Sequence, residues 1–135
     1  MPAGYSGTPL VKKLGIKEGA RVAFVDAPAS FAATLGPLPA GVATADGRGA
    51  VDLAVLFVRE RGALEAALPK MLRRLDTAGA LWVGWPKRAS KVPTDLTEDV
   101  VRAVAIANGV VDVKVCAIDE TWSGLKLVRR LKDRR

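Results

Sequence analysis

The stretch VDLAVLFV, residues 51–58, decides the fold class of this chain of 135 residues. Its apolar residues follow one another instead of alternating with polar ones, which is typical of a strand buried on both faces of a parallel sheet. Residues 80–85, ALWVGW, predict a second such strand. Residues 60–76 between them predict a helix that is kinked or divided at Pro69 and ended by Gly79, since leucines recur there at helical spacing. These leucines are Leu64, Leu68, Leu72 and Leu75.

Shorter elements are predicted before this strand-helix-strand unit. Residues 8–15 predict a short N-terminal helical segment, because Thr8 is suited to cap it, Pro9 to begin it and Gly15 to end it. The other elements are predicted over residues 21–26 (a strand), 30–35 (a helix) and 42–45 (a strand).

The second half of the chain predicts another helix and a terminal hairpin. Thr97 is suited to cap a helix that Gly109 ends. Residues 111–118 and 125–131 then predict two strands, whose six-residue connection permits antiparallel pairing but no parallel crossover. The predicted fold class is α/β: one three-layer α/β/α Rossmann-like domain, residues 1–135, with a mostly parallel sheet that ends in an antiparallel hairpin.

The composition excludes several classes of chemistry. The chain has no histidine, so Ser-His-Asp and Cys-His catalysis and histidine metal sites are impossible. Its single cysteine, Cys116, has no partner for an internal disulfide. Residues 1–15 lack a signal peptide's apolar stretch, and prolines and glycines interrupt the uncharged run 27–45 too often for a spanning helix. We therefore expect a cytoplasmic protein without a membrane span.

Positive charge is unevenly distributed along the chain. Lys and Arg outnumber Asp and Glu by 21 to 14, which gives a net charge of +7. Residues 125–135 form a basic C-terminal strand and tail, and residues 87–91 hold a second group of cations. Such a surface attracts anions, including nucleic acids, acidic lipids and phosphorylated ligands, although a solvated charged tail explains the same pattern.

Four motifs spread over almost the whole chain carry a resemblance to a known family. They are YSGTPL (5–10), KKLGIK (12–17), LWVGWPK (81–87) and KVCAIDETWSGLK (114–126). The sequence resembles a family of small bacterial proteins that is classified only as a domain of unknown function. Since that family has no established activity, the resemblance implies a fold and a bacterial cytoplasmic setting only.

The order of elements also resembles the Rossmann-like fold of class I methyltransferases. LGIKEGARVAFVDAP, residues 14–28, resembles the entry to their first strand, and VDLAVLFV with ALPKMLRRLDTAGALWVGWPK resembles their fourth strand, helix and fifth strand. Cofactor sites of this fold need glycines after the first strand, but the loop has none before Gly36, and Pro28 removes an amide donor. Phe31 is expected to lie over the space a cofactor would fill. We predict no cofactor, neither S-adenosylmethionine nor a dinucleotide.

Ligands of open α/β sheets bind at the carboxyl ends of the strands, here residues 26–30, 58–61 and 85–88. Trp85 is placed to stack on a nucleobase while Lys87 or Arg88 meets a phosphate. The alternative is that Trp85 caps the core and the two cations are solvated. The candidate ligand-binding residues are Trp85, Lys87, Arg88, Asp26 and Ser30.

Two other surfaces are candidates for binding. Backbone amides at the start of the N-terminal helical segment are suited to hold an anion, although a simple cap explains the same residues. Its candidate anion-binding residues are Thr8, Lys12 and Lys13. The candidate interaction surface in the hairpin and tail comprises Trp122, Lys126, Arg129 and Arg130.

Two features of the hairpin receive no chemical role. Asp119 and Glu120 are sequence neighbours, which usually point apart, so we assign them neither a metal nor a proton transfer. Cys116 lies among apolar residues of a predicted strand and is expected to behave as a small hydrophobic residue. No catalytic residue and no metal ligand is predicted.

The sequence therefore favours a non-catalytic, methyltransferase-like domain that binds an anionic small molecule or a protein partner. One alternative is a small transferase-like enzyme that uses the strand-end crevice. The other is weak, sequence-independent nucleic-acid binding through the basic tail, which carries no recognised motif. The oligomeric state stays open.

Overall fold

The computed structural model describes residues 8–45 and 49–133, and in these residues six strands form one sheet in the order β2-β1-β3-β4-β6-β5. Four of them, β1 to β4, run parallel, β6 is antiparallel to β4, and β5 is antiparallel to β6. The strands are β1 (Arg21–Val25), β2 (Ala43–Thr44), β3 (Val51–Phe57), β4 (Leu75–Pro86), β5 (Val110–Ala117) and β6 (Trp122–Arg129). The predicted mostly parallel sheet with an antiparallel hairpin at its end is confirmed.

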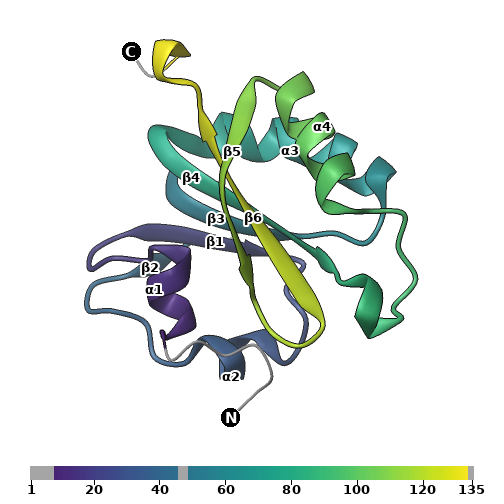
Figure 1. Cartoon of the computed structure of the whole chain (residues 1–135). Helices are drawn as coiled ribbons and strands as arrows, with labels where there is room; N and C mark the ends of the chain where they lie inside the picture. The colour runs from purple at the N-terminus through teal and green to yellow at the C-terminus, as the bar shows by residue number, and fades with distance from the viewer. Residues whose placement is uncertain (1–7, 46–48, 134–135) are drawn as a thin grey trace.

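Helices cover both faces of the sheet, as Figure 1 shows. They are α1 (Leu10–Leu14), α2 (Phe31–Leu35), α3 (Arg61–Arg74) and α4 (Glu98–Ala107), with short 3-10 turns η1 (Arg88–Ser90) and η2 (Leu131–Asp133). The apolar side chains of α3 and α4 pack with one set of strand residues, and those of α1 and α2 with another. The three-layer architecture thus follows from strands that are apolar on both faces.

The boundary between α3 and β4 differs from the prediction. We expected Gly79 to end the helix, but α3 ends at Arg74 and Leu75 already pairs with Val51 in the sheet. Gly79 is needed for another reason: a Cβ there would lie 2.7 Å from the backbone oxygen of Asp52. Pro69 lies inside a single helix and does not begin a second one.

Two other boundaries also need correction. Pro9 occupies the N-cap position of α1, and no side chain caps that helix, so the predicted Thr8 cap is wrong. The predicted stop at Gly15 is confirmed, since this glycine ends the helix in the left-handed conformation with φ 82°. The last strand begins at Trp122 and ends at Arg129, earlier than predicted, because Trp122 pairs with Pro86 of β4.

Some predicted features lie outside the described residues. They are Tyr5, Ser6 and Gly7 of the YSGTPL motif, and Arg134 and Arg135 of the basic tail.

Candidate functional site

The carboxyl ends of the parallel strands meet at one edge of the sheet, which is where the sequence predicts the ligand-binding residues. The strand order places β2 on one side of β1 and β3 on the other, so the chain changes direction across the sheet between β1 and β3. Ligands of doubly wound sheets bind beside such a switch point. The cavities along this edge include one beyond β4, one beyond β1 and β3, and a smaller one beside the loop that follows β1.

The cavity beyond β4 has a volume of about 670 Å³. It lies between the end of β4, η1 and the segment that leads to α4. We call it the β4 cavity; its lining includes Trp85, Lys87, Arg88, Lys91, residues 92–98 and Ser123. Three of the five predicted ligand-binding residues, Trp85, Lys87 and Arg88, are therefore brought together here.

Hydrogen bonds hold the turn that carries these cations. The backbone N–H of Lys87 donates to the carbonyl oxygen of Thr121 at 2.8 Å, which ties the turn to the hairpin. The Ser90 hydroxyl donates to the Lys87 carbonyl oxygen at 2.6 Å and accepts from the backbone N–H of Val92 at 3.2 Å. Lys91 ends η1 in the left-handed region, with φ 61°, a conformation rare for a residue other than glycine. These hydrogen bonds therefore fix the backbone of the turn that carries Lys87, Arg88 and Lys91.

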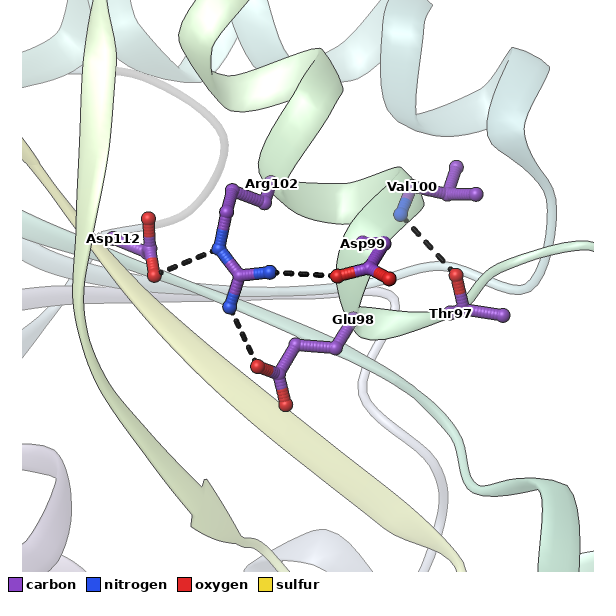
Figure 2. Close-up of polar contacts among 6 residues, drawn as sticks. All are labelled: Thr97, Glu98, Asp99, Val100, Arg102 and Asp112. Carbon is purple, nitrogen blue, oxygen red and sulfur yellow. Dashed lines mark hydrogen bonds and ion pairs between the residues drawn. The ribbon is translucent and has the colours of Figure 1, made fainter.

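The charge balance of the β4 cavity is positive. Its three cations, Lys87, Arg88 and Lys91, outnumber its two carboxylates, and one of these, Glu98, pairs with Arg102 of α4, as Figure 2 shows. The other carboxylate, Asp95, accepts from the backbone N–H of Arg61 at 2.7 Å. Within the described ranges, no carboxylate lies at ion-pair distance from the cations of the cavity, Lys87, Arg88 and Lys91. Unneutralised cations in a recess favour the binding of an anion.

Trp85 contributes less to this cavity than the sequence suggested. Its side chain belongs to the apolar core between the sheet and α4, and the residue is only 5% exposed. Its ring therefore offers little surface on which a nucleobase can stack, and the alternative that Trp85 caps the core describes its position. Of the other apolar lining residues, Leu96 is as buried as Trp85, at 4% exposed, whereas Val92 and Pro93 are more exposed.

The second cavity lies beyond β1 and β3 and has a volume of about 330 Å³. We call it the switch-point cavity; it is lined by Asp26, Pro28, Phe57, Val58, Arg59, Ala63, Ala67 and Trp122. Of the predicted ligand-binding residues it contains Asp26, while Ser30 lines neither cavity. Arg59 was not selected from the sequence, although it is the first charged residue after β3 and lies in the strand-end segment 58–61.

Phe31, which was expected to lie over the space a cofactor would fill, is a core residue that also lines a cavity beside the loop after β1. Its side chain is 3% exposed and packs edge-to-face between Phe24 and Phe57, with ring centroids 5.2 and 4.9 Å away. The ring of Phe57 in turn contacts that of Trp122. This aromatic series packs at the ends of β1 and β3, and two of its members, Phe57 and Trp122, line the switch-point cavity.

The candidate anion-binding residues at the N-terminus are not brought together. Thr8 precedes α1, whereas Lys12 and Lys13 stand in its last turn, at the opposite end of a five-residue helix. The end of α1 is fixed against the sheet instead, because Trp82 Nε1 donates to the carbonyl oxygen of Leu14 at 2.9 Å.

The candidate interaction residues of the hairpin and tail also lie in separate environments. Trp122 is 6% exposed and belongs to the core. Lys126 is half-buried on β6, directly opposite Lys114 of β5. The Arg129 guanidinium donates to the carbonyl oxygens of Leu72 in α3 and of Leu75 and Asp76 at the start of β4, and Arg130 pairs with Asp133 at 3.0 Å.

The features without an assigned role have structural explanations. Asp119 Oδ1 accepts from the backbone N–H groups of Thr121 and Trp122 at 2.8 and 2.7 Å, and so shapes the hairpin turn. Burial raises the pKa of Cys116, and the nearby lysines only partly oppose this effect. Among residues 8–45 and 49–133, we find no cluster of three potential metal ligands and no helix that could cross a membrane.

Comparisons with known proteins give a family and a fold. The model of a family described as "Protein of unknown function (DUF3052)" matches residues 37–131. No curated protein matches the sequence.

Several solved structures share the fold at low sequence identity. A SAM-dependent methyltransferase from Aquifex aeolicus is similar at 14% identity and a TM-score of 0.61, over 92% of this chain and 89% of its own. Magnesium protoporphyrin IX methyltransferase from Synechocystis PCC 6803, with bound SAM, is similar at 12% identity and a TM-score of 0.57, over 90% of this chain and 74% of its own. Ribosomal protein L11 methylase from Lactobacillus delbrueckii subsp. bulgaricus is similar at 15% identity and a TM-score of 0.56, over 90% of this chain and 75% of its own. These similarities establish a methyltransferase-like Rossmann fold.

Proposed function

The chain belongs to the DUF3052 family of proteins of unknown function, and we propose that it is a non-catalytic binding domain for an anionic small molecule, held in the β4 cavity. One observation carries this proposal. Lys87, Arg88 and Lys91 line the cavity without a carboxylate partner among the described residues, while its own carboxylates are bound to other groups.

The lining suggests how such a ligand binds. Its anionic group meets the ammonium and guanidinium groups, which form charge-assisted hydrogen bonds to carboxylates or phosphates. The Ser123 hydroxyl, across the cavity on β6, offers a further donor. Val92 and Pro93 supply apolar surface for the body of the molecule. A volume of about 670 Å³ lies within the usual range of small-molecule sites.

The two alternatives, a transferase-like enzyme and a nucleic-acid-binding protein, would use different surfaces. A transferase-like enzyme would use the same edge of the sheet and would turn over its ligand. Nucleic-acid binding would rely on the basic tail, but Arg129 is engaged by the end of α3 and Arg130 by Asp133, which reduces the charge available to phosphates. This observation favours the β4 cavity over the tail.

A thermal-shift screen followed by titration tests the proposal. The probes are phosphate, pyrophosphate, nucleotides and di- and tricarboxylates, each added to the purified protein. A ligand that binds the native state raises the melting temperature. Because a hydrogen bond to a charged group contributes about 1.5–3 kcal/mol, Lys87→Ala or Arg88→Ala should weaken the best probe about tenfold or more.

Lys17→Ala is the matched control, because Lys17 is exposed and does not line the cavity. It should leave the affinity unchanged, and all three variants should melt close to the wild type in the absence of probe. Equal affinity of Lys87→Ala, Arg88→Ala and the wild type would move the site elsewhere. Chemical conversion of the probe would support the enzyme alternative.

A further inference from the structure

The switch-point cavity carries two opposite charges that are not used by the proposed anion site. Asp26 follows β1, and Arg59 follows β3, so the two side chains come from neighbouring parallel strands. Among the described residues neither makes an ion pair, so Asp26 and Arg59 do not neutralise each other. A carboxylate and a guanidinium therefore face one recess, both available to a ligand.

Both charged residues are held in place by the fold. Asp26 adopts a left-handed conformation, with φ 56°, and such strained positions concentrate at functional sites. The Arg59 guanidinium lies over the ring of Trp122, 5.9 Å from its centroid, which fixes its direction by a cation–π contact. The carbonyl oxygen of Arg59 also accepts from the Thr94 hydroxyl, so the backbone of the β3–α3 connection is anchored.

The remaining lining is apolar. Phe57, Val58 and Trp122 are buried and form the floor, with exposed fractions of 3%, 6% and 6%. Ala63 and Ala67, one turn apart on α3, form a wall whose small side chains leave space. A volume of about 330 Å³ is at the lower end of the range for ligand sites and suits a small molecule.

We propose that this cavity binds a small zwitterion, an α-amino acid with an apolar side chain. Its carboxylate pairs with the Arg59 guanidinium, and its ammonium pairs with the Asp26 carboxylate. The apolar side chain packs on the floor made by Phe57, Val58 and Trp122. A ligand with only one charge would leave either Asp26 or Arg59 without its counter-ion, so the arrangement selects against it.

This site is independent of the proposed anion site, because Asp26 and Arg59 do not line the β4 cavity. The two proposals can therefore fail separately. The variants Lys87→Ala and Arg88→Ala should leave amino-acid binding unchanged.

An NMR titration of the isotope-labelled protein tests the proposal. The probes are L-leucine and L-phenylalanine, together with N-acetyl-L-leucine, which lacks the ammonium, and L-leucinamide, which lacks the carboxylate. We expect saturable shifts of amides around the switch-point cavity with leucine or phenylalanine. Each of the two singly charged analogues should bind at least tenfold more weakly than leucine.

Two variants test which charged group of the amino acid pairs with Asp26 and which pairs with Arg59. In Asp26→Asn the preference for leucine over N-acetyl-leucine should disappear, and in Arg59→Gln the preference for leucine over leucinamide should disappear. Asparagine tolerates the left-handed backbone of residue 26, so the first variant should fold. Arg73→Gln, an exposed arginine of α3 outside the cavity, is the matched control and should keep both preferences.

Several results would overturn the proposal. They are the absence of binding by both amino acids, equal binding of leucine and its analogues by the wild type, and unchanged preferences in both variants. If the melting curve of Arg59→Gln shows that it does not fold, the comparison of the three leucine compounds on the wild type decides the question alone.

Discussion

Arg102 of α4 donates a 3.0 Å hydrogen bond from Nε to Oδ2 of Asp112 on the edge strand β5. The same guanidinium pairs with Glu98 and Asp99 in the first turn of its own helix, which Figure 2 shows, and Glu98 and Asp112 raise its pKa. Only the bond to Asp112 joins two elements. Asp112→Asn should therefore lower the melting temperature more than Asp99→Asn, whose carboxylate is 94% exposed. Equal melting curves of the two variants would contradict this role.

Arg129→Ala should destabilise the fold, because its guanidinium donates to the carbonyl oxygens of Leu72 in the last turn of α3 and of Leu75 and Asp76 at the start of β4, and so joins β6 to this junction. We expect a loss of about 1.5–3 kcal/mol in the free energy of unfolding, measured by urea denaturation. Arg130→Ala removes only an exposed pair with Asp133 and is the matched control, with a change within about 0.5 kcal/mol. A larger loss of unfolding free energy in Arg130→Ala than in Arg129→Ala would refute this role of Arg129.

The glycines at positions 79 and 62 should respond in opposite ways to alanine. Gly79→Ala places a Cβ 2.7 Å from the backbone oxygen of Asp52 and 3.0 Å from that of Asp76, so it should destabilise the protein. Gly62 lies in the first turn of α3 with no neighbour within 4 Å of an added Cβ. Gly62→Ala should raise stability by up to about 1 kcal/mol, since alanine favours the helix. Calorimetric melting of both variants checks the two signs.

The stability contributed by Asp52 should be lost in acid. The Arg21 guanidinium and backbone N–H bind this carboxylate at 2.7 to 3.1 Å and lower its pKa. Because the folded pKa lies below the unfolded value of about 3.9, the contribution is present above that pH and disappears as the pH falls through the folded pKa. Melting curves of the wild type and Asp52→Asn should therefore differ near neutral pH and converge at low pH. A difference in melting temperature between the wild type and Asp52→Asn that persists at low pH, where Asp52 is protonated, would refute this explanation.

S-adenosylmethionine should not bind with micromolar affinity. The loop after β1 has Ala27, Pro28 and Ala29 where cofactor sites of this fold bring glycine backbone against the ligand, and Pro28 itself lines the switch-point cavity. Isothermal titration calorimetry measures the affinity directly. A saturable micromolar isotherm would restore a methyltransferase hypothesis for this chain.

Most strands and helices could be predicted because local pattern and tertiary environment agree. The apolar run of β3 and the capping of α4 by Thr97, whose Oγ1 accepts from Val100, are examples. The prediction failed at Leu75, which continues the helical spacing of leucines but pairs with Val51 in the sheet. Here a contact between distant residues overrode the local periodicity, and the glycine interpreted as a helix stop serves a close backbone approach.

The candidate site was predictable only in outline. Lys87 and Arg88 could be found because they follow a strand directly, and the fold class determines where strands end. Lys91 and the wall at residues 92–98 depend on the path of the segment between η1 and α4. The contact between Arg59 and Trp122 joins residues 63 positions apart, and no local pattern in the sequence indicates that the hairpin returns across the end of β3.

The position of β6 in the sheet has a consequence for the order of folding events. β6 lies between β4 and β5, although both precede it in the sequence. Until residues 122–129 dock, β4 lacks a neighbouring strand on one side and β5 has no neighbouring strand on either side. The first four strands precede residues 122–129 in the sequence, but the six-stranded sheet is complete only when this segment lies between β4 and β5. A nascent or truncated chain without β6 would expose the open edge of β4 to association with other chains, so residues 122–129 protect this edge in the folded protein.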